Sequence, residues 1–298
     1  MSAAPEEIRL AARGLQLAAL RWNAGAPHRV LATHGWLDNA ASFQALAPLL
    51  ADCELVALDL PGHGRSAHRG AGNLQFFIEY VADVVAALDA LGWTETILLG
   101  HSLGAGVMSC VAGTIPDRVR ALLLIEGFAP QPSPPEKIVD SLRAAVTAAL
   151  RGPGESSGYP DLAAAIVARR KGYWPLSDAV SGAILQRALT ADADGTLRWH
   201  TDPRLRQPSA FRLTEEQLAA LLREVRAPAL LLGAAGGLFP TRDAHAAGLA
   251  AMPQLEYRCL PGGHHLHLEP ETAPAVAAAL RDFLAALPRA RARPDLPL

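Results

Sequence analysis

The pentapeptide Gly100-His101-Ser102-Leu103-Gly104 constrains this chain more than any other feature of its sequence. It lies between the apolar run 96–99 and a stretch of helix-forming residues, 105–112. A Gly-x-Ser-x-Gly segment between a buried strand and a helix predicts a sharp turn with the serine at its tip. The turn crowds the positions two before and two after the serine, so both must lack bulk. The segment therefore predicts a nucleophilic serine, with the backbone N–H of Leu103 and the start of the following helix directed at charge that develops beside it.

Composition narrows the class of protein. The chain has 298 residues, half of them hydrophobic, which is enough for one large α/β domain or a core with an insertion. A formal net charge of −2 gives no electrostatic basis for binding nucleic acid or an anionic membrane. No apolar run approaches the roughly 18 residues of a membrane span, and no signal-peptide core is present. We therefore expect a cytoplasmic monomer or homodimer without a nucleic-acid or membrane partner.

The three cysteines are Cys53, Cys110 and Cys259, each among apolar neighbours. They lack the spacing of a metal site, so the sequence predicts reduced, buried thiols.

Predicted strands and helices alternate over the first 128 residues. Apolar runs predict strands at 8–12, 15–22, 30–33, 55–58, 96–99 and 119–125. Periodicity predicts helices over 40–50, 75–91 and 105–112. The alternation resumes later, with strands at 229–232 and 255–260 and helices over 241–251 and 272–287. Such alternation is typical of a mostly parallel sheet with helices on both faces.

A different pattern separates the two alternating parts. Between 137 and 222 the sequence predicts helices over 138–150, 162–170, 177–189 and 215–223 and no convincing strand. We therefore predict an α/β core of residues 1–128 and 227–288, a helical cap insertion over 129–226 that roofs the site, and a frayed tail over 289–298. Much of the aromatic content lies in this insertion, as Tyr159, Tyr173, Trp174, Trp199 and Phe211, where packing within the cap or lining of a pocket are both open.

A serine hydroxyl needs a base to take its proton, and the base needs an acid to orient it. The histidine-rich loop 261–269 follows the last predicted strand, where an imidazole can reach the serine. Here the chain resembles the α/β-hydrolase family, whose pattern Gly-His-x-x-x-x-Glu matches Gly263, His264 and Glu269. The resemblance implies that His264 is the general base, whereas His267 and Glu269 orient the loop. A metal-binding loop is disfavoured because no third ligand lies in an obvious register, so no metal site is expected.

Other motifs extend this resemblance over nearly the whole chain outside the insertion. His34-Gly35-Trp36 matches the family's oxyanion loop, and 59–66 matches its Asp-x-Pro-Gly-x-Gly-x-Ser turn, for which a structural role is expected. The segments 34–39 and 199–205 are similar to the serine-hydrolase-like branch of the family. The resemblance implies an α/β-hydrolase fold with about eight strands, and the backbone N–H groups of Trp36 and Leu103 as oxyanion donors. It also implies a cofactor-independent hydrolase with a poorly defined substrate, which we expect to be a small acyl compound.

The acid departs from the family's usual pattern. In the stretch Gly233 to Pro240, the position of the usual aspartate holds Gly236. Glu126 follows the buried strand 119–125, where some α/β-hydrolases, haloalkane dehalogenases among them, place their acid. Burying an unpaired carboxylate is costly, so we predict that Glu126 pairs with His264. The alternatives are that Glu126 caps the insertion or binds a backbone N–H, and that Asp243 is the acid.

These residues predict a serine hydrolase that cleaves a carboxylic ester or thioester through an acyl-enzyme intermediate. An apolar substrate pocket is expected from residues that follow strand ends, namely Trp36, Phe128, Leu238 and Phe239. Carbon–carbon hydrolysis, acyl transfer and perhydrolysis use the same residues and stay open. A non-enzymatic receptor for a small ligand on this fold is favoured only by Gly236. A dinucleotide site at 104–106 is disfavoured because the third glycine of its fingerprint is absent.

Overall fold

The computed structural model describes residues 4–70, 72–154, 158–172, 174, 176–239 and 249–287. Most of the predicted helix 241–251, including Asp243, and the predicted tail 289–298 lie outside these residues.

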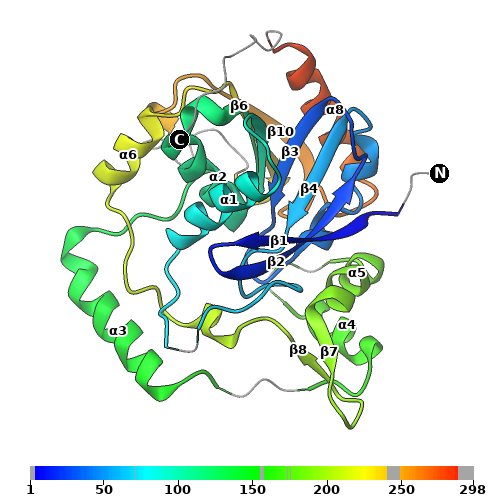
Figure 1. Ribbon diagram of the computed structural model, residues 1–298, viewed down its shortest axis with the longest axis vertical. Coiled ribbons are helices and arrows are strands. Elements are labelled where there is room, and N and C mark those ends of the chain that lie inside the picture. Colours follow the sequence, from blue (N-terminus) through cyan, green and yellow to red (C-terminus); the bar gives the residue numbers. More distant parts are fainter. Residues whose placement is uncertain are drawn as a thin grey trace.

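An eight-stranded sheet forms the centre of the molecule (Figure 1). Its strands, in spatial order, are β1 (Glu6–Ala12), β2 (Leu15–Trp22), β4 (Cys53–Leu58), β3 (His28–Thr33), β5 (Thr96–His101), β6 (Val119–Ile125), β9 (Ala229–Gly236) and β10 (Leu255–Gly263). Only β2 runs antiparallel to its neighbours; every pair from β4 to β10 is parallel. The central strands β4 and β5 are buried along their whole length, as a parallel sheet covered on both faces requires.

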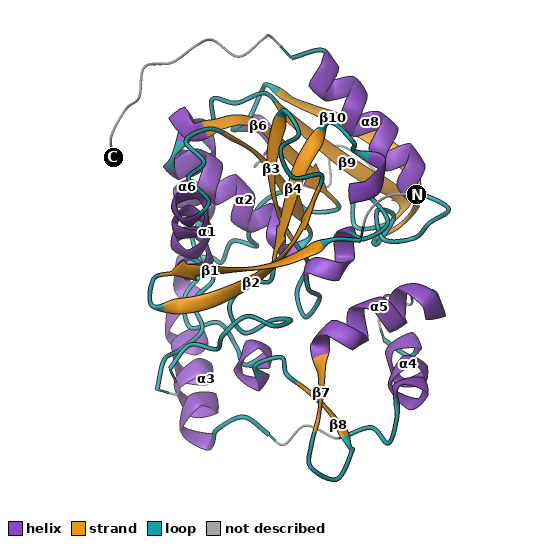
Figure 2. Ribbon diagram, turned by 45° about the vertical axis from the view of Figure 1, so that its right-hand side comes forward, coloured by secondary structure: helices purple, strands orange, loops and turns teal. Residues whose placement is uncertain are grey.

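Helices cover both faces of this sheet, as Figure 2 shows, which confirms the predicted layers. On one face α1 (Glu79–Ala90), α2 (Leu103–Thr114) and α6 (Glu215–Arg223) contribute buried apolar residues to one core cluster. On the other face α8 (Ala273–Ala285) shares a second cluster with two short 3₁₀ helices, Ala40–Phe43 and Ala47–Leu49. The predicted helix 40–50 is therefore divided, and Pro48, which cannot donate a backbone hydrogen bond, lies in its second half.

Between β6 and α6 the chain leaves the sheet. It forms α3 (Ile138–Arg151), α4 (Leu162–Arg170) and α5 (Asp178–Ala188), which lie on one side of the sheet with the hairpin β7 (Leu189–Ala191) and β8 (Leu197–Trp199) (Figures 1 and 2). The prediction of no strand here was wrong, because two three-residue strands are too short to show a period of two. The helix α6, which we assigned to the insertion, packs against α2. The boundaries 129 and 226 stay a prediction.

The cysteines differ in burial, and the described helices are short or polar. Cys53 and Cys110 are buried as predicted, but Cys259 is exposed because β10 is an edge strand of the sheet. Within the described residues, every helix is too short or too polar to cross a bilayer.

Candidate active site

Ser102 lies at a strained turn between β5 and α2. Its φ of 51° and ψ of −114° are outside the regions that non-glycine residues ordinarily adopt. Such strain is found mainly at functional sites, where the surrounding structure holds it in place. A Cβ atom on Gly100 would lie 2.5 Å from the Cα of Ala105. The turn therefore has the geometry that the pentapeptide predicts.

The loop after β3 lies directly against this turn. The N–H of Gly104 donates to the carbonyl of His34 at 3.1 Å, and a Cβ on Gly104 would come within 2.3 Å of the Thr33 carbonyl oxygen. This contact brings the segment His34-Gly35-Trp36 beside the start of α2. Leu103 is the first residue of α2, so its N–H has no acceptor within that helix. The two predicted oxyanion donors, Trp36 and Leu103, thus come from adjacent segments.

His264 joins Ser102 to Glu126 through its two ring nitrogens. The distance from its Nε2 to the Ser102 Oγ is 3.1 Å, and the distance from its Nδ1 to the Glu126 Oε2 is also 3.1 Å. Glu126 immediately follows β6 and His264 immediately follows β10. The structure therefore brings together three predicted residues from separate parts of the chain.

Glu126 is fully buried and also accepts backbone hydrogen bonds. Its carboxylate receives the N–H groups of Ala234 at 2.7 Å, Leu238 at 2.6 Å and Phe239 at 3.3 Å. Burial acts to raise the pKa of Glu126, but the hydrogen bonds from His264 and from these backbone groups outweigh it and hold the pKa below its ordinary value. The carboxylate is therefore ionised at neutral pH. Pairing with His264 and binding of backbone N–H groups, which the sequence left as alternatives, occur together.

The loop after β9 wraps around this carboxylate where the usual aspartate is missing. A Cβ on Gly237 would lie 2.2 Å from the Glu126 Oε2. Glycine at 237 is thus required for the loop to approach Glu126, and Gly236 provides no side chain that could replace it.

A Gly237→Ala substitution is expected to displace Glu126. Because the new methyl group would overlap the carboxylate, we expect kcat to fall at least about tenfold and the free energy of unfolding to fall by about 1–3 kcal/mol. Steady-state kinetics and urea unfolding measure the two effects. Gly72→Ala is the matched control, since a Cβ on Gly72 meets nothing within 4 Å. Wild-type behaviour of Gly237→Ala would show that the loop does not hold Glu126.

A cluster of histidines supports the His264 loop. The buried His101 contacts the His264 carbonyl through its Nε2 at 3.0 Å, and its ring lies 4.2 Å from that of His267. Burial lowers the pKa of His101 and of His267 well below the usual value, so both rings are neutral. Sequence reasoning missed this role of His101, although its place inside the pentapeptide was the available signal.

Among the described residues, His101, His264 and His265 form a group of side chains with the spacing that a metal ion could use. Their ligand atoms all lie within 4.8 Å of one another. However, both ring nitrogens of His264 are already bonded to Ser102 and Glu126. A metal ion could use His264 only by displacing one of them.

Two aspartates of the sequence motifs, Asp38 on the oxyanion side and Asp59, have other partners. Asp38 lies 3.4 Å from the Nε2 of His265 and 3.5 Å from the guanidinium of Arg169, so it does not pair with His264. Asp59 accepts the backbone N–H of Ala40 at 2.7 Å and of Arg65 at 2.8 Å, in agreement with the structural role that its motif implies. Asp243 lies outside the described residues.

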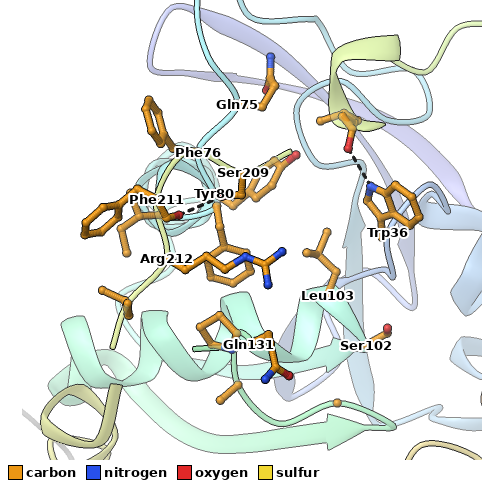
Figure 3. Close-up of a pocket in the computed structure, with 18 of the residues that line it drawn as sticks. Trp36, Gln75, Phe76, Tyr80, Ser102, Leu103, Gln131, Ser209, Phe211 and Arg212 are labelled. Atoms are coloured by element: carbon orange, nitrogen blue, oxygen red, sulfur yellow. Dashed lines mark hydrogen bonds between the residues drawn. The ribbon is translucent and has the colours of Figure 1, made fainter. Parts of the chain in front are cut away.

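Two cavities meet at Ser102. One has a volume of about 550 Å³ and is lined by all four predicted pocket residues, Trp36, Phe128, Leu238 and Phe239. Figure 3 shows Ser102 and Leu103 at one side of this cavity. The other, of about 340 Å³, is lined by Ser102, His264 and Trp174, whose ring lies 5.0 Å from that of His264.

The remaining cap aromatics divide between the two roles that the sequence left open. Phe211 lines the larger cavity. Tyr159 and Trp199 pack on each other with ring centroids 6.3 Å apart, and Trp199 also lines the cavity of about 340 Å³. Tyr173 lies outside the described residues.

Acidic pH is expected to destabilise the fold through buried neutral histidines. Burial lowers the pKa of His34 to about 4 and of His63 to about 3, from 6.5. The Nε2 of His34 accepts the N–H of Leu60 at 3.1 Å, which requires the neutral ring. Below pH 6.5 the unfolded chain therefore binds more protons than the folded one. The contribution of these two histidines to the free energy of unfolding is complete above pH 6.5 and is lost as the pH falls toward 4. Each of these histidines contributes up to about 1.4 kcal/mol per pH unit.

Urea unfolding between pH 8 and pH 5 measures this slope. Because His63→Leu removes one of the titrating groups, it should reduce the slope below pH 6.5. A free energy of unfolding that stays constant or rises from pH 7 to pH 5 would contradict the prediction.

Known proteins are similar to this chain over most of its length. A family model described as the alpha/beta hydrolase fold matches residues 29–271. Serine hydrolase-like protein 2 of Homo sapiens is 31% identical over 297 residues, which cover 93% of this chain and 93% of that protein. The crystal structure of a hypothetical protein from Pseudomonas aeruginosa aligns with a TM-score of 0.88 and 39% identity, over 94% of this chain and 99% of that one. The thioesterase domain from the curacin biosynthetic pathway aligns with a TM-score of 0.81 and 27% identity, over 94% of this chain and 100% of that domain.

Proposed function

This chain belongs to the α/β-hydrolase superfamily, in its serine-hydrolase-like branch, and from that premise we propose that it cleaves a carboxylic ester or thioester through an acyl-enzyme intermediate. One observation supports the proposal above all others. The hydrogen-bonded series Glu126–His264–Ser102 ends at a hydroxyl that lines two cavities, with 3.1 Å at each step.

In the first step Ser102 attacks the substrate carbonyl. As its Oγ forms the new bond to carbon, the Nε2 of His264 takes the hydroxyl proton, and the anionic Glu126 stabilises the imidazolium that results. The backbone N–H groups of Trp36 and Leu103 donate to the oxygen on which negative charge develops. The tetrahedral intermediate then collapses, the bond to the leaving group breaks, and the imidazolium returns its proton to the departing alcohol or thiol.

In the second step water takes the place of Ser102 as the nucleophile. His264 takes a proton from a water molecule, whose oxygen attacks the acyl carbon. Collapse of this second intermediate releases the carboxylic acid, and the proton on His264 returns to the Ser102 oxygen. Glu126 keeps its charge throughout, in agreement with its lowered pKa.

The nature of the cavity and of the relatives supports an acyl substrate. The larger cavity is lined mainly by apolar side chains, which suits an aliphatic or aryl group. One structural relative at 27% identity is a thioesterase domain. Glu126, at 3.1 Å from the Nδ1 of His264, offers an acid in place of the one absent at Gly236, which weighs against a non-enzymatic receptor.

Hydrolysis of a chain-length series of p-nitrophenyl esters, together with a matching series of acyl thioesters, tests this proposal. We expect turnover with a single optimum of chain length, and an acyl adduct on the intact protein when the reaction is quenched early. Absence of turnover with every member of both series would overturn it.

A further inference from the structure

The cavities beside Ser102 contain positive charge that the proposed reaction does not use. Arg206 and Arg212 both line the cavity of about 550 Å³. Arg206 also lines the cavity of about 340 Å³ that holds His264, and a third of about 350 Å³. Figure 3 shows the side chain of Arg212 extending into the larger cavity, toward the side on which Leu103 lies.

Neither guanidinium has a hydrogen bond or an ion pair in the part of the chain that the structure describes. Other arginines nearby are paired: Arg169 lies 3.5 Å from Asp38, Arg187 lies 2.9 Å from Asp59, and Arg204 lies 2.7 Å from Asp202. Arg169 also lines the cavity of about 340 Å³, but Asp38 occupies it, whereas Arg206 and Arg212 are exposed and keep all their N–H donors for a ligand.

Within the described residues, no carboxylate that lines these cavities is paired with Arg206 or Arg212. Glu126 is bonded to His264 and to three backbone N–H groups. Asp38 is paired with His265 and Arg169, and Asp202 with Arg204. In the cavity of about 550 Å³, two arginines, Arg206 and Arg212, therefore stand against one carboxylate, Glu126, so its described lining has a net positive charge.

The backbone next to Arg206 is fixed to the core. Trp36 donates its indole N–H to the Leu205 carbonyl at 3.1 Å, and the N–H of Asp202 donates to the Gly62 carbonyl at 2.8 Å. The guanidinium of Arg204 adds bonds to the carbonyls of Arg69 at 2.6 Å and Gly70 at 2.7 Å. The segment 202–205 thus places the backbone of Arg206 beside the loop that contains Trp36.

We propose that Arg206 and Arg212 bind an anionic oxygen group of the substrate, a carboxylate or a phosphate, so that the preferred substrate is an anionic ester or thioester. This inference rests on the proposed function. A guanidinium binds carboxylate and phosphate oxygens through paired N–H donors and is weakly hydrated, so it loses little on leaving water. The apolar wall between the arginines and Ser102 receives the carbon chain that separates the anionic group from the scissile bond.

The anionic group can belong to either half of the substrate. A carboxylate at the far end of the acyl chain would enter with the acyl group, whereas a phosphate would enter on a thiol leaving group. Two pairs of substrates separate these sources. The first pair is the mono-p-nitrophenyl ester of adipic acid against p-nitrophenyl hexanoate. The second is hexanoyl-coenzyme A against hexanoyl-N-acetylcysteamine.

The measured quantity is the ratio of kcat/KM for the charged member to kcat/KM for the neutral member of each pair. We expect a ratio above about ten in at least one pair for the wild type, and a loss of roughly 10- to 100-fold in that ratio for Arg206→Gln or Arg212→Gln. The matched control is Arg223→Gln on α6, an exposed arginine that lines none of these cavities; its ratio should equal that of the wild type.

The pair that responds identifies the source of the anion. Ratios near one in both pairs, or ratios unchanged in both cavity variants, would overturn this inference while turnover of the neutral members left the proposed function intact. Absence of turnover with all four substrates would overturn both.

Discussion

Ser102→Ala is expected to lose essentially all turnover, with kcat lower by a factor on the order of 10⁴ to 10⁶. Only the hydroxyl that lies 3.1 Å from the Nε2 of His264 is removed. Alanine and serine have the same backbone preferences to a first approximation, so the φ of 51° costs the variant no more than the wild type. The proposed oxyanion donors and the cavity remain in the variant, and we expect them to support the small activity that persists.

Steady-state kinetics with the best ester or thioester measures this loss. Thermal unfolding of the variant should coincide with that of the wild type, which separates chemistry from folding. If Ser102→Ala retained more than a few per cent of the wild-type kcat, Ser102 would not be the nucleophile.

Glu126→Gln is expected to lower kcat by about 10³- to 10⁴-fold, because a neutral amide neither holds His264 in the required tautomer nor stabilises its cation. One carboxylate oxygen accepts the N–H of Leu238 and faces the Nδ1 of His264. An amide nitrogen placed there would oppose two donors. We therefore also expect a loss of about 1–3 kcal/mol in the free energy of unfolding at neutral pH.

The pH dependence of this second effect provides a control. The lowered pKa of Glu126 means that its contribution to stability is complete above its ordinary pKa of 4.5 and is lost as the pH falls through the folded-state pKa. Unfolding by urea should show the wild type and Glu126→Gln converging below pH 4.5. A constant difference down to pH 3 would mean that the ionised form of Glu126 does not stabilise the fold.

The sequence predicted much of this site because local backbone rules encode it. Gly100 and Gly104 identify the turn, and the loop around His264 follows the last predicted strand. Glu126 followed from the cost of burying a carboxylate after an apolar strand. Each of these arguments needs only a few neighbouring residues.

Long-range pairing could not be predicted in the same way. The close approach of Gly237 to Glu126 is a contact between segments about 110 positions apart. The contact of His101 with the His264 carbonyl is between segments about 160 positions apart. Among the residues that the structure places, Arg204 has a carboxylate partner and Arg206 has none, and this difference depends on contacts across the cap and the core. The predicted helix over 75–91 begins only at Glu79, and the residues before it, Gln75 and Phe76, line the cavity instead.

The central claim is that Ser102 is activated by His264 and Glu126, and the rate of labelling by a fluorophosphonate tests it without knowledge of the substrate. We expect one phosphonyl group per wild-type chain, located on Ser102 by mass spectrometry of its peptide. Glu126→Gln should react at least about 100-fold more slowly, whereas Asp243→Asn should react at the wild-type rate. Labelling of Glu126→Gln at the wild-type rate, with slow labelling of Asp243→Asn, would contradict the account and assign the acid to Asp243.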